Sequence, residues 1–145
     1  MDNTIYTFDD KYWGQTGAGV IFYYQNDNEI LLGLRSNAVN EANTWGTIGG
    51  QVDECETPER AARREVHEEG HIKGNYKLKL LYVYKDGKFR YYNYIVPVKM
   101  KFKPKPNWEV DRFQWFNVNN LPTNLHFGVK SLLPSLKLYI KNAQF

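Results

Sequence analysis

Three glutamates lie close together in the chain, at positions 65, 68 and 69, inside the stretch GQVDECETPERAARREVHEEGHI that spans residues 50–72. If this stretch is helical, side chains three and four positions apart are neighbours, so the three carboxylates share one side of the helix. Their like charges oppose helix formation by roughly 0.2–0.5 kcal/mol per pair, and a bound cation would offset that cost. Mg²⁺ and Mn²⁺ prefer oxygen ligands, and Mg²⁺ is commonly held by one or two carboxylates together with substrate phosphates. The spacing therefore predicts a divalent-cation site and chemistry on phosphate groups.

The same stretch resembles the Nudix box, the signature G-x5-E-x7-R-E-U-x-E-E-x-G-U, in which U is a bulky aliphatic residue. The register fits without a gap, and eight of the nine specified positions match: Gly50, Glu56, Arg64, Glu65, Val66, Glu68, Glu69 and Ile72. His71 stands where the signature has its late glycine, and Gly70 precedes it. A solvated, charge-rich helix is the alternative, but generic charge patterning does not explain five charged positions in this fixed register.

The Nudix resemblance implies a metal site built on this stretch, with Mg²⁺ or Mn²⁺ as the cofactor. The ligands that it implies are Glu65, Glu68, Glu69 and the backbone carbonyl of Gly49. One of the three glutamates could also act as the general base, because a carboxylate beside a cation can accept a proton from water whose pKa the cation has lowered. We assign catalytic roles to Glu65, Glu68, Arg64 and Glu109, and the sequence does not choose the base among the three glutamates of the helix.

Two further groups complete the implied site. Arg64 and Glu56 would orient the loop of the box on its helix, which a bidentate contact between guanidinium and carboxylate does well. Some relatives carry an additional acid shortly before a tryptophan on a late strand, and Glu109, six residues before Trp115, is the best match. Asp111 is its rival.

The end of the box helix bears on the third glutamate. Gly70 or Gly74 can end the helix, and an end at Gly70 would shift Glu69 in its last turn. His71 is predicted to be a surface residue or a loop partner rather than a ligand, because a cation already surrounded by carboxylates gains little from imidazole.

For the substrate, Arg35 is predicted to meet phosphates and Trp45 to stack on a base. Weaker candidates are Tyr82, Tyr84 and the lysines at positions 99, 101, 103 and 105, since strand aromatics are usually core and lysines usually solvated. The resemblance implies a metal-dependent hydrolase that cleaves the diphosphate linkage of a nucleoside diphosphate joined to another moiety. Capped RNA is among the family's substrates, but no second motif in the chain selects it.

Other functions stay open. A catalytically silent domain could bind a nucleotide, although the presence of all three glutamates favours catalysis. An RNA-binding module could use the lysines of residues 101–105, but that basic patch is short and lacks a recognition motif. An isomerase with this box is a more remote possibility.

The remaining sequence predicts the elements that position the site. Turn residues separate strand-like runs at 18–24 and 29–35, and again at 77–84 and 89–99, so each pair predicts a hairpin. A short strand at 45–49 leads into the box, Thr57 and Pro58 begin its helix, and another strand follows at 109–118. Helical spacing after Pro122 predicts a final helix that Pro134 kinks or divides. These elements indicate an α+β fold, and the resemblance implies an α/β/α sandwich with a central mixed β-sheet.

Length and composition set the outer limits. A chain of 145 residues, 42% hydrophobic and 16% aromatic, predicts a single domain over residues 1–145. The net charge of +3 is too small for general nucleic-acid binding and suits an anionic small molecule. Cys55 is the only cysteine, and no run approaches the roughly 18 apolar residues that span a membrane. We therefore expect a cytoplasmic protein without a membrane partner, and the sequence leaves a homodimer open.

Overall fold

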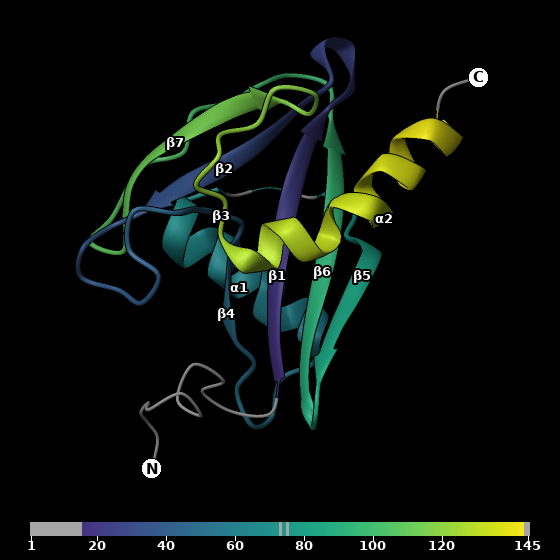
Figure 1. Cartoon of the computed structure of the whole chain (residues 1–145). Helices are drawn as coiled ribbons and strands as arrows, with labels where there is room; N and C mark the ends of the chain where they lie inside the picture. Colours follow the sequence, from purple (N-terminus) through teal and green to yellow (C-terminus); the bar gives the residue numbers. More distant parts are fainter. Residues whose placement is uncertain (1–15, 73, 75, 144–145) are drawn as a thin grey trace.

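A computed structural model of the chain describes residues 16–72, 74 and 76–143 (Figure 1). Its strands are β1 (Thr16–Tyr24), β2 (Glu29–Arg35), β3 (Trp45–Gly46), β4 (Ile48–Gln51), β5 (Lys79–Asp86), β6 (Phe89–Val98) and β7 (Val110–Asn117). The helices are α1 (Pro58–Gly70) and α2 (Phe127–Ala143), and a 3-10 turn, η2 (Gln25–Asp27), joins β1 to β2. Both predicted hairpins, the strand before the box and the late strand are thus present.

The strands form one mixed sheet around β1. Strand β1 pairs in parallel with β6 along its whole length, and β6 pairs antiparallel with β5. The other edge of β1 is shared, because Tyr23 and Tyr24 pair with β2 while residues 17–20 pair with β4. Strands β2 and β4 therefore separate from each other below the hairpin turn, and β2 continues outward to pair with β3 and β7. The backbone between β3 and β4 lies where the sheet divides.

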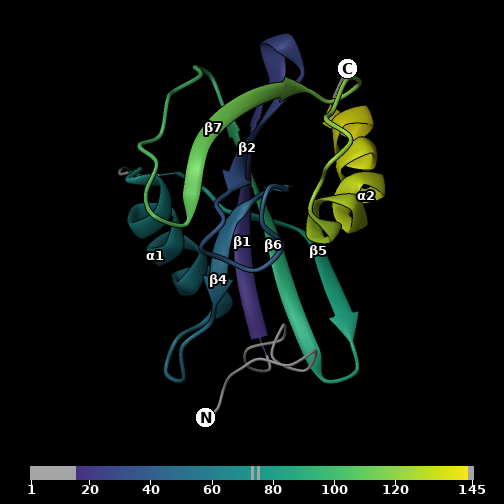
Figure 2. The same cartoon turned by 60° about the vertical axis from the view of Figure 1, so that its left-hand side comes forward.

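The two helices cover opposite faces of this sheet, as Figure 2 shows. Helix α1 packs through Ala61, Ala62 and Val66 on one face, in a cluster that includes Val20 and Ile48. Helix α2 packs on the other face through Val129, Leu132, Leu136 and Ile140. Alternation of side chains along β1 and β6 supplies apolar residues to both faces, as expected for strands buried between two helical layers. The predicted α/β/α sandwich with a mixed sheet is confirmed.

Helix α1 begins as its sequence predicts. The Thr57 hydroxyl accepts a hydrogen bond from the Arg60 backbone N–H at 3.2 Å, and Pro58 occupies the first helical position. At the other end, Gly70 belongs to the helix, and His71 follows in the left-handed conformation with φ 56°. His71 thus adopts the backbone conformation that a glycine usually provides at this place. Glu69 lies inside the helix and is not displaced from it.

Helix α2 continues through Pro134 without a break. Of the two predicted effects of Pro134, division of the helix into two parts is wrong. Apolar contacts on both sides of the proline, by Leu132 and Leu136, hold the helix against the sheet despite the lost backbone hydrogen bond. In the part of the chain that the structure describes, neither helix combines the length and apolar character needed to cross a bilayer.

Candidate functional site

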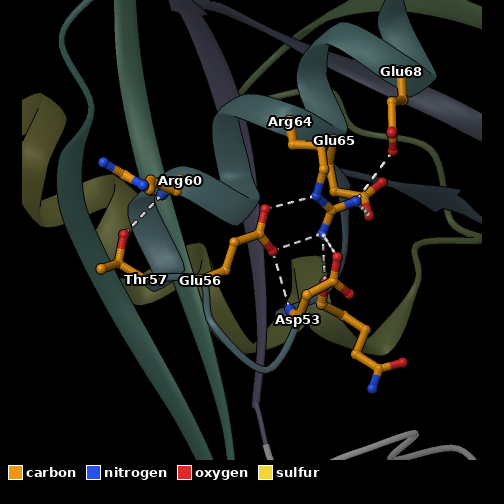
Figure 3. Close-up of polar contacts among 8 residues, drawn as sticks. Asp53, Glu56, Thr57, Arg60, Arg64, Glu65 and Glu68 are labelled. Carbon is orange, nitrogen blue, oxygen red and sulfur yellow. Dashed lines mark hydrogen bonds and ion pairs between the residues drawn. The ribbon is translucent and has the colours of Figure 1, made fainter.

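Arg64, in the middle of α1, is the centre of a network of charges (Figure 3). Its Nε and Nη2 atoms donate to the two carboxylate oxygens of Glu56 at 2.7 and 2.9 Å. Its Nη1 atom donates to Glu65 and to Glu68, each at 3.1 Å. The bidentate pairing of Arg64 with Glu56 is the geometry in which a guanidinium binds a carboxylate most specifically.

This network also fixes the loop between β4 and α1. Arg64 Nη2 donates to the backbone carbonyl of Gln51 at 2.9 Å, and Glu56 accepts from the backbone N–H of Asp53 at 3.0 Å. The hydrogen bond from Arg64 is the main reason that the pKa of Glu56 is lowered to about 2. Glu56 therefore stays ionised and keeps its hold on Arg64, so the loop is held to the helix.

Glu65 lies in a confined position against the strand before the loop. Only 15% of its side chain is exposed, and its carboxylate contacts the backbone at Gly50 so closely that a Cβ there would lie 2.7 Å from Cδ of Glu65. Burial raises the pKa of Glu65, the ion pair with Arg64 lowers it, and Glu68 raises it further. A Cβ at position 50 would displace the Glu65 carboxylate, and the φ of Gly50 is not positive.

Glu69 is the most deeply placed acid of the helix, with 8% of its surface exposed. Burial raises the pKa of its carboxyl well above the ordinary value, and the charges of Glu65 and Glu109 raise it further. Arg35 and a hydrogen bond from the Gly49 backbone act in the opposite direction and do not cancel the effect of burial. A carboxylate that is desolvated beside other acids is a place where a cation would be strongly favoured.

The carboxylates of the box glutamates do not converge on one point in the structure. Glu68 is 58% exposed while Glu69 is buried, and Arg64 already binds both Glu65 and Glu68. Over residues 16–143, apart from 73 and 75, no three acidic, histidine or cysteine side chains are grouped closely enough to hold a metal ion as they stand. Like charges repel when no cation is between them, and Arg64 neutralises part of the set. The donor set nevertheless fits Mg²⁺ or Mn²⁺. Both cations prefer hard oxygen ligands, and the glutamates together carry more negative charge than Arg64 neutralises.

Of the two acids near the late tryptophan, the structure brings only Glu109 to the site. Glu109 is half-buried, and the pKa of its carboxyl is raised by burial and by Glu68 and lowered by Arg35. Asp111 is exposed on β7 and does not line the cavity beside the site. Arg35 does line it, and its Nε atom donates to the Asn40 carbonyl at 2.8 Å.

A cavity of about 550 Å³ adjoins these acids on the α2 side of the sheet. Its walls come from the loop after β2, from the β3–β4 backbone, from β5 and β6, and from the first turn of α2. Glu109 and Gly49 form the acidic end of the cavity. Four aromatic side chains also line the cavity: Tyr84, Phe89, Tyr91 and Phe127. Such a volume and lining suit a drug-sized molecule with a flat apolar part.

Tyr91 connects the cavity to the two glycine-containing strands. Its hydroxyl lies so close to the backbones of Gly19 and Gly49 that a Cβ on either residue would collide with it. Burial and the nearby Glu69 charge raise the pKa of Tyr91, so this hydroxyl stays protonated. Gly49 is therefore close to both Tyr91 and Glu69, although it was selected from the sequence only as a carbonyl donor to metal.

Trp45 requires a correction. It was predicted to stack on a base, but it is 5% exposed and belongs to the core on the α2 side, where it makes an edge contact with Phe116 at 4.8 Å between ring centroids. Strand β3 pairs with β2 in a register that turns this indole inward and leaves Gly46 on the cavity wall. The aromatic surface of the cavity comes instead from β5, β6 and α2. Of the weaker candidates, Tyr84 lines the cavity.

Lys101 is also engaged elsewhere. Its ammonium lies 2.9 Å from Glu29 and 3.5 Å from Asp27, at the hairpin turn between β1 and β2. None of the lysines proposed as phosphate contacts lines the cavity. Among the residues that line it, Arg35 is the side chain with a permanent positive charge.

Sequence reasoning missed Asn93 and His126, which both line the cavity. Neither residue belongs to the box, and they lie on β6 and just before α2. A polar asparagine in a strand between apolar and aromatic residues was the available signal for the first of them. His126, immediately before the helix, carried no signal beyond its position.

The chain is similar in sequence to known proteins. The profile described as NUDIX domain matches residues 14–136. The chain is 32% identical over 101 residues to the Caenorhabditis elegans protein m7GpppN-mRNA hydrolase dcap-2, covering 66% of this chain and 13% of that protein. It is 29% identical over 124 residues to the Rattus norvegicus protein diphosphoinositol polyphosphate phosphohydrolase 2, covering 81% of this chain and 66% of that protein. The chain thus spans less than two thirds of the length of each of these relatives.

Solved structures give the same result for the fold. A MutT NUDIX hydrolase from Burkholderia pseudomallei is 28% identical, with a TM-score of 0.67 over 83% of this chain and 95% of that one. An Ap4A hydrolase from C. elegans, solved as a binary complex, is 18% identical, with a TM-score of 0.66 over 87% of this chain and 98% of that one. The second likeness concerns the fold alone.

Proposed function

The chain belongs to the Nudix family, and from this premise we propose that it is a metal-dependent pyrophosphohydrolase. Its substrate would be a nucleoside diphosphate joined through the diphosphate to a second moiety. The observation that carries the proposal is the position of the acids beside a cavity. Burial and the charges of Glu65 and Glu109 raise the pKa of the Glu69 carboxyl, and Glu109 lines a cavity that also has aromatic walls. A diphosphate at the acidic end would leave an attached base among the aromatic rings.

Glu65, Glu68, Glu69 and the Gly49 carbonyl would hold Mg²⁺ or Mn²⁺. When bound, such a cation supplies charge neutralisation for the diphosphate and lowers the pKa of a coordinated water. Arg64 keeps Glu56 and the β4–α1 loop in place, which orients Glu65. Glu65, Glu68 or Glu109 would accept the proton from the attacking water, and Arg35 would compensate charge on the phosphate that faces it.

The lining of the cavity bears on the choice of substrate. The relatives' names refer to capped mRNA and to diphosphoinositol polyphosphate. A polyphosphorylated inositol carries many negative charges, whereas Arg35 is the one permanently positive side chain among the described lining residues. Aromatic walls match a nucleobase better than they match a ring of phosphates. We therefore place nucleoside diphosphate derivatives first, with capped RNA as a special case of that class.

A substrate screen tests the proposal. The protein would be incubated with Mg²⁺ or Mn²⁺ and a panel of dinucleoside polyphosphates, nucleotide sugars, ADP-ribose and cap analogues, with products resolved by chromatography. Metal-stimulated release of a nucleoside monophosphate is expected for at least one compound. Glu65→Gln and Glu68→Gln should each lower that rate by roughly 10²–10⁴-fold, since they keep the size of the side chain and remove the charge.

Glu59→Gln provides the matched control on the same helix. Glu59 is exposed and pairs with Arg63 at 3.4 Å, away from the network of Arg64. Its substitution should leave turnover unchanged, because exposed pairs of this kind contribute little. Absence of metal-stimulated turnover on every compound would contradict the proposal. Tight binding of a nucleotide without turnover would indicate the silent binding module instead.

A further inference from the structure

We propose that Asn93 and His126 read the hydrogen-bonding edge of the substrate's nucleobase, Asn93 as an acceptor and His126 as a donor. The inference rests on the proposed function for the identity of the ligand, but it concerns two neutral polar groups of the cavity lining rather than the acids. It assigns to this chain a base-recognition site made of β6 and the residue before α2. The ligand class is a heteroaromatic base that presents an acceptor and an N–H donor side by side.

Asn93 is a buried amide whose orientation is fixed. It is 3% exposed, and its Nδ2 atom donates to the backbone carbonyls of Tyr82 at 3.3 Å and Tyr91 at 3.5 Å. Two carbonyl acceptors on one end identify that end as nitrogen, so Oδ1 is the other end. No group in the described part of the chain donates to Oδ1. Among the described residues no buried side-chain oxygen or nitrogen lacks a partner, so Oδ1 is accessible, and Asn93 lines the cavity.

His126 presents the complementary group. Its Nδ1 atom accepts a hydrogen bond from the Gly128 backbone N–H at 3.0 Å, so in the neutral ring the proton resides on Nε2. Burial and the charge of Arg35 lower the pKa of His126 to about 4, which keeps the ring neutral near pH 7. Nε2–H has no acceptor among the described residues and faces the same cavity. It is therefore a fixed donor whose tautomer the first turn of α2 determines.

The aromatic surroundings favour a flat ligand between these two groups. The rings of His126 and Phe127 are stacked with centroids 4.5 Å apart, and Tyr84 meets Phe127 edge-on at 6.0 Å. Such surfaces bind the faces of a base without regard to its identity, whereas a donor and an acceptor at fixed positions select its edge. Unpaired polar groups in a pocket of this kind disfavour a ligand that cannot satisfy both of them.

Binding without catalysis tests this inference separately from the proposed hydrolysis. The affinities of AMP, GMP, CMP and UMP would be measured calorimetrically in EDTA, with ribose 5-phosphate as the probe that has a phosphate and no base. At least one nucleotide should bind roughly ten- to a hundredfold more tightly than ribose 5-phosphate. A methylated probe removes the donor of the base, for example N6,N6-dimethyl-AMP for AMP or N3-methyl-UMP for UMP. It should lose most of that advantage on the wild-type protein.

Variants identify the groups responsible. His126→Asn keeps a good N-cap for α2 and removes Nε2–H, while Asn93→Ala removes Oδ1. Each should bind the preferred nucleotide roughly tenfold more weakly, and Asn93→Ala should no longer distinguish it from the methylated probe. Ser131→Ala is the matched control, because Ser131 lines the cavity but its hydroxyl is engaged with the Gly128 carbonyl at 2.8 Å. It should behave like the wild type.

The outcomes are distinct. If every nucleotide binds no better than ribose 5-phosphate, or if the wild-type protein binds methylated and unmethylated probes equally, the base-reading assignment is wrong even when the enzyme hydrolyses a nucleotide. If the discrimination is present in EDTA and no compound is hydrolysed with metal, the assignment stands and the proposed hydrolysis fails. Thermal unfolding of each variant shows whether it is folded, and the methylated probes test the idea on the wild type should Asn93→Ala fail to fold.

Discussion

The two ends of the site are built from opposite kinds of polar group. At the α1 end, four carboxylates surround the guanidinium of Arg64. Burial and neighbouring negative charges raise the pKa of Glu69 there. At the α2 end, an amide and a neutral imidazole lie among aromatic rings. Charged groups of the first kind bind ions, and their protonation depends strongly on whether an ion is bound. Neutral groups of the second kind select a ligand by its shape and its hydrogen-bonding groups. The comparison suggests that one end provides chemistry and the other provides selectivity.

The two ends also respond to pH with opposite signs. The pKa of Glu69 is raised, so the folded protein binds more protons there than the unfolded chain, and stability falls as pH rises through that range. The pKa of His126 is lowered from 6.5 to about 4, so the unfolded chain binds more protons in this interval. Stability from His126 is therefore fully present above about pH 6.5 and is lost as pH falls toward about 4. The two contributions can be separated by substitution.

The largest effect is expected from this titration of His126. Between pH 6.5 and 4 the wild type should lose about 3 kcal/mol of unfolding free energy relative to His126→Asn, because a pKa difference of one unit corresponds to about 1.4 kcal/mol. Urea unfolding followed by tryptophan fluorescence at several pH values measures the difference. His67→Asn, which removes an exposed histidine from α1, is the control and should follow the wild-type profile. Parallel profiles for wild type and His126→Asn would mean that the ring is not desolvated.

Gly50→Ala tests the α1 end with a slightly smaller effect. The added Cβ would lie 2.7 Å from Cδ of Glu65, so the flexible carboxylate must move while the backbone stays in place. Displacement of a reacting group by about 1 Å can cost roughly 10²-fold in rate, and we expect a loss of that order in turnover. Stability should change little, since the end of a side chain can shift at low cost. Steady-state kinetics together with thermal unfolding would separate the two effects.

Gly46→Ala is the matched glycine control at the cavity. Its Cβ would meet only ordinary contacts, the nearest being Cδ of Arg35 and Cβ of His126, each at 3.7 Å. It should retain most of the wild-type turnover. Equal losses in Gly46→Ala and Gly50→Ala would show that the contact with Glu65 is not the reason for the glycine at position 50.

The difference between the ends also explains what the sequence could predict. The α1 end is local: Glu56, Arg64 and the glutamates lie within residues 50–72, where helical spacing and capping determine their neighbours. The hairpins followed from turn residues and strand patterns, the sandwich from the resemblance to the Nudix family, and the start of α1 at Thr57 was predicted correctly. Each of these signals acts over a few residues, so one sequence is enough to find it.

The α2 end could not be predicted in the same way, because its residues come from segments far apart in the chain. Asn93 and His126 meet one cavity only because β1 pairs with both β6 and β4, and because α2 returns across that face of the sheet. Long-range pairing of β3 with β2 also directs the Trp45 side chain into the core and leaves the neighbouring Gly46 on the cavity wall. A shift of one residue in register reverses which side chains face a cavity. The register between strands far apart in the chain was not evident from the local patterns on which the predictions were based.

The smallest expected effect concerns His71, the position at which the chain departs from the box. His71 holds φ 56° at the end of α1, and its Nδ1 atom lies 3.1 Å from the Lys105 carbonyl in the loop that leads to Glu109. His71→Ala should be destabilising, because it keeps the left-handed strain and loses the contact. His71→Gly loses the same contact but relieves the strain, so it should be more stable than His71→Ala by about 1 kcal/mol, which corresponds to roughly 2–4 °C in Tm.

Comparison of the two variants with the wild type separates the roles of backbone and ring. If the wild type is more stable than His71→Gly, the contact with Lys105 outweighs the strain, and hydrogen exchange in residues 99–107 should then be faster in both variants. If His71→Gly exceeds the wild type, the exposed contact is worth less than the strain, as expected for a single exposed hydrogen bond of about 0.5–1 kcal/mol. Equal stability of the alanine and glycine variants would contradict the left-handed conformation itself. The end of α1 would then not depend on that conformation to present Glu69.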